Sequence, residues 1–97
     1  MKKITFYSMV REDGAAIAKL HNGYTDGTYN YYKKDSFWHA IHPTNGLSIC
    51  SSRTRKEAAD RVHNPVMLQR IAAALERQQD AVERFTAAVK KAKEPAV

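Results

Sequence analysis

FWHAIHPTNGLSICSSRTRKEAA, residues 37–59, is the stretch that decides the fold. Two short runs rich in apolar residues, 38–41 and 47–51, flank HPTNG, whose Asn-Gly pair is a strong signal for the turn of a β-hairpin. The segment TRKE follows directly, and a threonine three residues before a glutamate is typical of a capping box at a helix N-terminus. We therefore predict a hairpin that leads straight into a helix beginning near Arg55.

Upstream of this hairpin, alternating apolar and polar residues between turn signals predict three further strands, over Ile4–Val10, Ala15–Leu20 and Tyr29–Lys33. With the hairpin they form an antiparallel meander of about five strands over residues 1–52. Alanine and charged residues dominate residues 53–97 and predict helices. The length of 97 residues allows one domain. The predicted fold class is α+β, a sheet followed by a short helix and a long C-terminal helix.

The first helix should end before Pro65, because Asn64 precedes a proline and such residues avoid helical geometry. The second should run from Val66 to about Lys93, a length of about 40 Å at the usual rise per residue. Its apolar seam, interrupted by one polar residue, comprises Leu68, Ile71, Leu75, Gln78, Val82, Phe85, Val89 and Ala92. Short strands cannot cover so long a rod. We therefore expect its N-terminal half to pack on the sheet, its C-terminal half to meet a second copy, and Glu94–Val97 to fray.

The charge and the cysteine content limit the kinds of partner and compartment. Lys and Arg number 16 against 10 Asp and Glu, and the net charge of +6 favours anionic partners such as nucleic acid, nucleotides or acidic protein surfaces. Cys50 is the single cysteine, so no internal disulfide can form, which suits a reducing cytosol. The N-terminus has no signal-peptide pattern, and no apolar stretch is long enough to cross a membrane. We expect a cytoplasmic protein.

The predicted start of the first helix is a candidate anion site. Three cations, Arg53, Arg55 and Lys56, lie where a helix has free amides and positive dipole charge. Ser51 and Thr54 add hydroxyl groups. This combination favours a phosphate-bearing ligand. The alternative is that the cations are solvated, since capping boxes occur at many helices that bind nothing.

An aromatic-rich strip precedes that helix, formed by Tyr24, Tyr29, Tyr31, Tyr32, Phe37 and Trp38. These rings could stack on a nucleobase. The alternative is ordinary sheet packing, because aromatic residues favour strands. Tyr31 and Tyr32 are adjacent on a strand and must face opposite sides, so at least one should be exposed or at an interface.

Three histidines and the cysteine raise the question of a metal or catalytic site. His39 and His42 are three residues apart and would point to opposite faces of a strand, and neither Cys-x-x-Cys nor His-Glu-x-x-His occurs. Cys50 next to Ile49 is best interpreted as a small core residue. His63 closes the first helix. We expect no metal, no cofactor and no catalytic residue, and therefore no enzyme.

The run WHAIHPTNGLSICSSRTRKEA, together with FYS near the N-terminus and YNYY in the middle, resembles the first-described phage Thoeris anti-defence proteins. These are small cytoplasmic sponges that phages use against bacterial signalling immunity. The resemblance implies an N-terminal antiparallel sheet, C-terminal helices and a homo-oligomer. It also implies capture of a cyclic ADP-ribose isomer, without hydrolysis, at the junction of protomers. Some members hold cyclic oligonucleotides at separate sites.

Both lines of reasoning lead to the same chemistry. A pyrophosphate favours arginine, ribose hydroxyls favour Asn, Ser or Thr, and adenine favours an aromatic plane. The candidate ligand residues are Arg53, Arg55, Arg70, Ser51, Thr54 and Asn64, with Trp38 or Tyr31 as the stacking ring. The rival hypotheses are a small nucleic-acid-binding protein and a protein-binding phage inhibitor of the anti-CRISPR kind. Acidic residues among the cations of the second helix disfavour nucleic acid.

Overall fold

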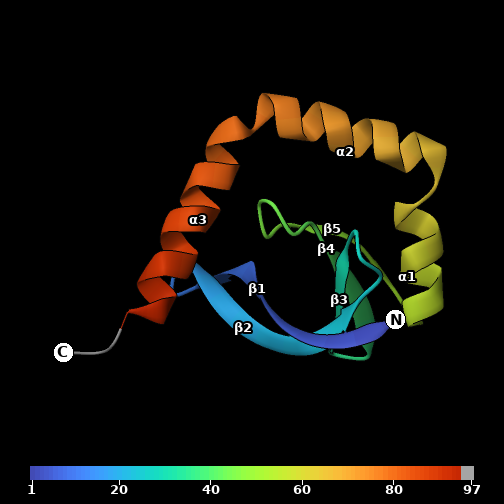
Figure 1. The fold of residues 1–97 in the computed structure, drawn as a ribbon, viewed down its shortest axis with the longest axis horizontal. Helices are drawn as coiled ribbons and strands as arrows, with labels where there is room; N and C mark the ends of the chain where they lie inside the picture. Colours follow the sequence, from blue (N-terminus) through green and yellow to red (C-terminus); the bar gives the residue numbers. More distant parts are fainter. Residues whose placement is uncertain (95–97) are drawn as a thin grey trace.

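The computed structural model describes residues 1–94 and has a five-stranded antiparallel sheet followed by three helices (Figure 1). The strands lie in sheet order β1-β2-β3-β4-β5. They are β1 (Lys2–Glu12), β2 (Ala15–Thr25), β3 (Asn30–Lys34), β4 (Phe37–Ile41) and β5 (Ser48–Ser52). The helices are α1 (Arg55–Val62), α2 (Pro65–Arg77) and α3 (Gln79–Lys93). The predicted α+β fold, a meander followed by helices, is confirmed.

The first hairpin is longer than predicted. β1 and β2 have 11 residues each and pair in register from Lys2 opposite Thr25 to Glu12 opposite Ala15. The prediction ended β2 at Leu20, because the glycine that follows suggested a loop. Gly23 instead lies within the strand, where a Cβ atom would collide with the Tyr31 carbonyl oxygen. The glycine is therefore needed for the close approach of β2 and β3.

The meander curls back on itself. The HPTNG connection between β4 and β5 forms the predicted turn, in which the Gly46 amide donates to the His42 carbonyl at 2.8 Å. Gly46 has a positive φ of 70°, which favours glycine. Its carbonyl accepts a 2.8 Å hydrogen bond from the amide of Met9 on the edge strand β1. This bond links the far end of the sheet to its first strand.

Both faces of the sheet are covered, one by α1 and the other by the curled first hairpin. On one face Tyr31 and Ala40 pack against Ala58 and Val62 of α1. The other face carries a second cluster of Phe6, Tyr32 and Ile41. The expectation that Tyr31 or Tyr32 would be exposed or at an interface is wrong, since both are buried within this chain, with exposed fractions of 0% and 9%. The long hairpin brings the Phe6 ring within 6.1 Å of the Tyr32 ring, a packing that strand alternation alone does not predict.

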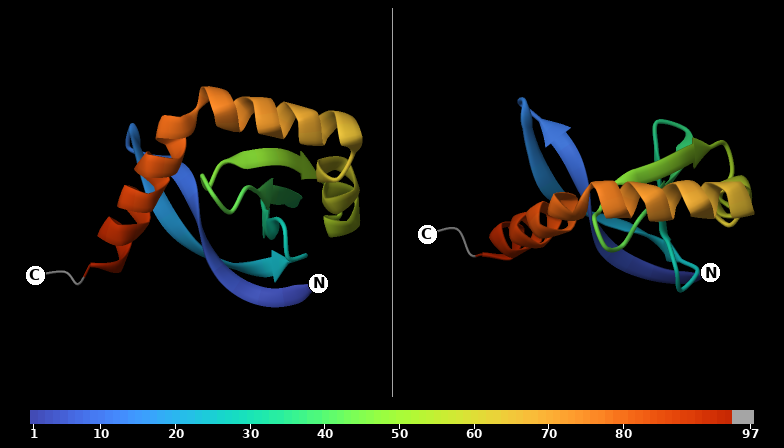
Figure 2. Two further views of the ribbon diagram at one scale, coloured as in Figure 1. Left: turned by 45° about the horizontal axis from the view of Figure 1, so that its top comes forward. Right: turned by 90° about the horizontal axis from the view of Figure 1, so that it is seen from above.

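The three helices form an arch around the sheet (Figures 1 and 2). The predicted continuous helix over 66–93 is wrong, because Gln78 (φ −121°, ψ 47°) separates α2 from α3. α3 lies along the first hairpin, and Phe85 is 7% exposed against the turn at Gly46. The C-terminal half of the seam is thus covered by the chain's own sheet and not left open. The N-terminal half of the seam, which was expected to pack on the sheet, lies on α2, and α2 has no buried residue.

Glu94 caps α3, and the rest of the predicted frayed tail, residues 95–97, lies outside the described residues. Within residues 1–94, no helix combines the length and the apolar character that crossing a bilayer requires.

Candidate functional site

The start of α1 has the predicted cap. Thr54 is extended (φ −124°, ψ 154°), and its hydroxyl accepts a 3.1 Å hydrogen bond from the Glu57 amide. A full capping box also has a bond from the Thr54 amide to the Glu57 side chain, which is absent among the described residues. Arg53, Thr54 and Lys56 are all exposed around the cap. The helix therefore begins where predicted, next to solvent-facing cations.

Arg55 differs from its neighbours because its guanidinium stacks on aromatic rings. Its Cζ atom lies 4.0 Å from the centroid of the Tyr24 ring and 5.6 Å from that of Trp38. Such cation–π contacts are electrostatically attractive. Trp38 is half-buried and packs against the core under α1. Arg55 and Trp38 thus lie together, as the sequence analysis expected, but they contact each other and form part of the attachment of α1 to the sheet.

Arg53 lines an open depression of about 440 Å³, which we name the β5–α1 depression. Its other walls are Phe37, Ser51, Ser52, Glu57, Asp60 and Arg61. Arg61 Nη1 donates to the Ser51 carbonyl oxygen at 2.8 Å and to the Ser52 hydroxyl at 3.2 Å, which holds the guanidinium against the edge strand β5. Phe37 is 44% exposed, so its ring is accessible to a ligand. Two guanidinium groups, two carboxylates, two serines and an aromatic ring therefore line this depression, and the Ser52 hydroxyl is already bonded to Arg61.

The remaining predicted ligand residues lie elsewhere. Asn64 caps α2, and its Oδ1 accepts a 3.0 Å bond from the Val66 amide. Arg70 lines a separate cavity beneath α2. The assignment of Tyr31 as a ligand-contacting ring is wrong, because its exposed fraction is 0% and its hydroxyl donates to Asp26 at 2.6 Å. The eight candidates are thus dispersed and do not form one site.

Asp26 is a polar centre that the sequence analysis missed. Its Oδ1 accepts bonds from the Thr28 and Tyr29 amides, at 2.9 and 2.8 Å, and Oδ2 lies 2.7 Å from His63 Nε2 at the end of α1. Burial raises the pKa of Asp26, but the bonds from Tyr29, Tyr31 and His63 outweigh it and hold the pKa at about 2. An Asp-Gly pair signals the local turn. The contact with His63 spans 37 residues and has no local signal.

The residues considered as metal ligands are dispersed. His39 stacks on Tyr32 with ring centroids 5.3 Å apart, and His42 Nδ1 accepts from the Thr44 amide at 3.1 Å. Burial raises the pKa of the Cys50 thiol, as expected for a small core residue. Within the described part of the chain no three His, Cys, Asp or Glu side chains form a group suited to a metal ion.

A serine–histidine pair occurs inside the curl of the sheet. Ser8 Oγ lies 2.7 Å from His21 Nε2, and His21 stacks on Tyr32 with centroids 3.9 Å apart. Burial, and after it the charge of Lys19, lowers the pKa of His21. Ser8 is 1% exposed, so a substrate has no access to its hydroxyl in this structure.

A second depression, of about 200 Å³, is strongly basic, and we name it the hairpin depression. Its lining residues include four cations, Arg11, Lys19, Lys33 and Lys34. Glu12 offsets part of this charge through an exposed ion pair with Lys19 at 3.2 Å. The depression is thus an accessible positive patch away from α1.

Comparison with known proteins identifies no similar protein. Neither a scan against protein-family models, nor a search of curated proteins, nor a search of solved structures found a match to this chain.

Proposed function

We propose that this chain is a non-catalytic nucleotide-binding protein that captures a cyclic ADP-ribose isomer, or a related cyclic nucleotide immune signal, in the β5–α1 depression. The convergence of Arg53 and Arg61 with two serines and the exposed Phe37 ring supports this proposal. Capture without cleavage would serve a phage in the cytosol of its bacterial host, as in the proteins that the sequence resembles. No cofactor or metal is needed for such a role.

Each part of the ligand has a chemical counterpart in the depression. The pyrophosphate suits Arg53 and the free donors of Arg61, because guanidinium groups bind phosphate oxygens through paired hydrogen bonds. The adenine ring suits the face of Phe37. Carboxylates accept hydrogen bonds from ribose hydroxyls, as acidic residues do in dinucleotide sites. Glu57 and Asp60 can fill that role. Their negative charges also repel a phosphate group placed next to them.

A homo-oligomer through the C-terminal helical region is part of the proposal. The depression is open on its outer side, and a second copy would enclose a ligand held there. Since the apolar face of α3 already packs on the sheet, the contact is expected at α2. The side chains of Val66 and Leu68 on this helix are 58% and 40% exposed.

The proposal is tested by titrating cyclic ADP-ribose isomers into the purified protein in a calorimeter, with linear ADP-ribose as the ligand control. Arg53→Ala should weaken binding at least tenfold, because a hydrogen bond to a charged group contributes about 1.5–3 kcal/mol. Lys56→Ala is the matched control, since Lys56 is exposed beside the same cap but does not line the depression. It should bind as the unmodified protein does.

Capture is separated from cleavage by recovering the ligand. The complex is heat-denatured and the released small molecule is identified by mass spectrometry. Intact cyclic ligand is expected. Recovery of linear ADP-ribose, or unchanged binding by Arg53→Ala and Arg61→Ala, would contradict the proposal.

The hairpin depression favours nucleic acid as the second candidate ligand. Four cations around an open hollow are an electrostatic footprint of phosphate-backbone binding. Binding to random duplex DNA that falls steeply with salt, and that Lys33→Ala with Lys34→Ala weakens, would support this alternative. Arg53→Ala would leave such binding nearly unchanged.

A further inference from the structure

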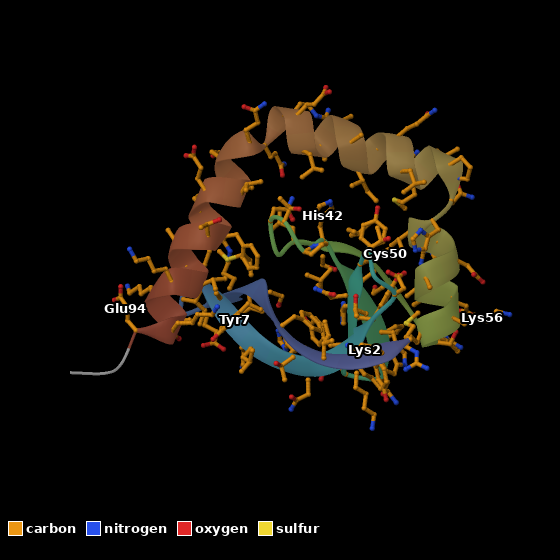
Figure 3. The ribbon with its side chains drawn as sticks, viewed as in Figure 1. Lys2, Tyr7, His42, Cys50, Lys56 and Glu94 are labelled. Carbon is orange, nitrogen blue, oxygen red and sulfur yellow. The ribbon has the colours of Figure 1, made fainter. Side chains whose placement is uncertain are left out.

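A cavity of about 230 Å³ is lined by residues of α2, of the β4–β5 turn and of β5. Figure 3 shows His42 reaching into the space under α2. Ile71, Ala74 and Leu75 of α2 form one wall, and Leu47 lies opposite them. The cavity is partly open to solvent, and its volume exceeds that of an engineered cavity of about 150 Å³ in another protein that holds benzene, so it has room for a larger aromatic molecule.

The cavity exists because α2 is held at its ends. α2 is joined to α1 through the Asn64 cap and to α3 through the break at Gln78. Its apolar side, including Ile71 and Leu75, faces the cavity and is half-buried, although α2 has no buried residue. A clearly amphipathic helix would normally bury this stripe against the core. Apolar surface thus remains available to a ligand.

The polar groups that border the cavity include three hydrogen-bond donors. His42 Nδ1 accepts from the Thr44 amide, so in the neutral ring the proton is on Nε2. Burial lowers the pKa of His42, which favours that neutral ring. Arg70 is always charged. No Asp or Glu is among the residues that line the cavity.

Asn45 contributes the third donor. It is 7% exposed, and its Oδ1 accepts from the Leu47 amide at 3.0 Å, which fixes the orientation of the amide. Nδ2 has no hydrogen-bond partner among the described residues. Every fully buried side-chain nitrogen and oxygen of those residues does have one, so Nδ2 must border open space. Since Asn45 lines the cavity, we place this donor at the cavity wall.

We propose that this cavity binds a small aromatic carboxylate, with the ring between α2 and β5 and the carboxylate at His42, Asn45 and Arg70. Apolar walls favour the ring, and the donors and the absence of lining acids favour an anionic head group. The proposal is independent of nucleotide capture, because no residue lines both this cavity and the β5–α1 depression.

The test uses indoleacetate as the probe and its neutral analogue indoleacetamide as the ligand control. Proton–nitrogen correlation spectra of the full chain are recorded during each titration. Indoleacetate should shift the Asn45 side-chain amide signals and the backbone signals of Leu47 and Ile71, while Arg53 and Phe37 should not move. Indoleacetamide should bind at least about tenfold more weakly, because it lacks the charge that Arg70 recognises.

Two variants with matched controls follow. Arg70→Gln should remove the preference for the carboxylate, whereas Arg77→Gln on the same helix, outside the cavity lining, should keep it. Ala74→Phe should fill the cavity and abolish the shifts, whereas Ala73→Phe, on the exposed side of α2, should not. Signals of α1 and β3 that stay unchanged show that each variant is folded.

Equal binding of the acid and the amide would overturn the proposal, as would the absence of shifts at millimolar indoleacetate.

Discussion

At the scale of single residues, two arginines on either side of Thr54 have different roles. Arg53 is exposed at a depression, whereas Arg55 stacks on Tyr24 and Trp38. The sequence predicts the helix start, the cap and the crowding of cations. It cannot separate the two arginines, because the partner ring of Arg55 comes from β2, about thirty residues earlier in the chain, and β2 was predicted to end before it.

We expect Arg55→Ala to destabilise the fold by about 1 kcal/mol, since it removes the cation–π contact of a half-buried guanidinium. Urea unfolding followed by tryptophan fluorescence measures this directly, because Trp38 is the only tryptophan. Lys56→Ala serves as the control and should change the free energy of unfolding by less than about 0.5 kcal/mol. Equal values for both variants would show that the stack contributes nothing.

The Asp26 carboxylate predicts a pH dependence of stability. Its pKa in the fold is about 2, below its ordinary value of 3.8, so the folded state favours the charged form. The stabilisation is complete above the ordinary pKa and is lost as the pH falls toward 2. In Asp26→Asn the free energy of unfolding should be lower at neutral pH and should fall less between about pH 4 and pH 2.

Urea unfolding at a series of pH values measures how the free energy of unfolding changes with pH in the unmodified protein and in Asp26→Asn. Asp80→Asn, which changes an exposed carboxylate paired with Arg84 on α3, should keep the slope of the unmodified protein. An Asp26→Asn variant with an unchanged acid slope would exclude this carboxylate as the source.

At the scale of elements, the sequence predicts that residues 66–93 are helical but not that they form two helices, α2 and α3. No glycine or proline marks the break at Gln78, so helical periodicity alone predicts one rod. Asp80 in the first turn of α3 is a weak local signal, because acidic residues favour helix N-termini. The break is explained by a tertiary contact, because it lets Phe85 pack on Gly46.

Phe85→Ala tests whether this contact holds α3 in place. Phe85 is 7% exposed, and truncating a buried phenylalanine typically costs about 3–5 kcal/mol. We expect a loss in this range by urea unfolding, together with faster amide exchange throughout α3. Thr86→Ala, at the neighbouring exposed position, should lie within about 0.5 kcal/mol of the unmodified protein. A small effect of Phe85→Ala would mean that α3 is held by other contacts.

At the scale of the whole molecule, the meander is predictable because each strand pairs with the next one in sequence. The curl is not, because it depends on the Met9–Gly46 bond between distant segments. That curl brings Phe6 over Tyr32 and Ile41. Tyr31, a reasonable stacking candidate on an uncovered sheet, has no exposed surface here because Ala58 and Val62 of α1 cover it. The cavity under α2 likewise depends on contacts between distant segments, which sequence analysis does not predict.

The proposed homo-oligomer gives a prediction at this scale. Light scattering after size exclusion should give at least twice the mass of one chain, because the apolar side chains of Val66 and Leu68 are exposed on α2. Leu68→Asp should reduce the mass to that of a single chain, whereas Gln69→Asp, an exposed polar position beside it, should not. A single-chain mass for the unmodified protein would contradict an oligomer.

The hydrogen bond from the Met9 amide to the Gly46 carbonyl has a consequence for the order of folding. Contacts close in sequence form quickly, and those that close long loops form slowly. All strand pairings here join neighbours along the chain, so we expect the successive hairpins to assemble first. Closure at Gly46, and the arrival of Phe85 against it, would then limit the rate. Refolding experiments should therefore detect the native tryptophan environment before α3 becomes protected from solvent exchange.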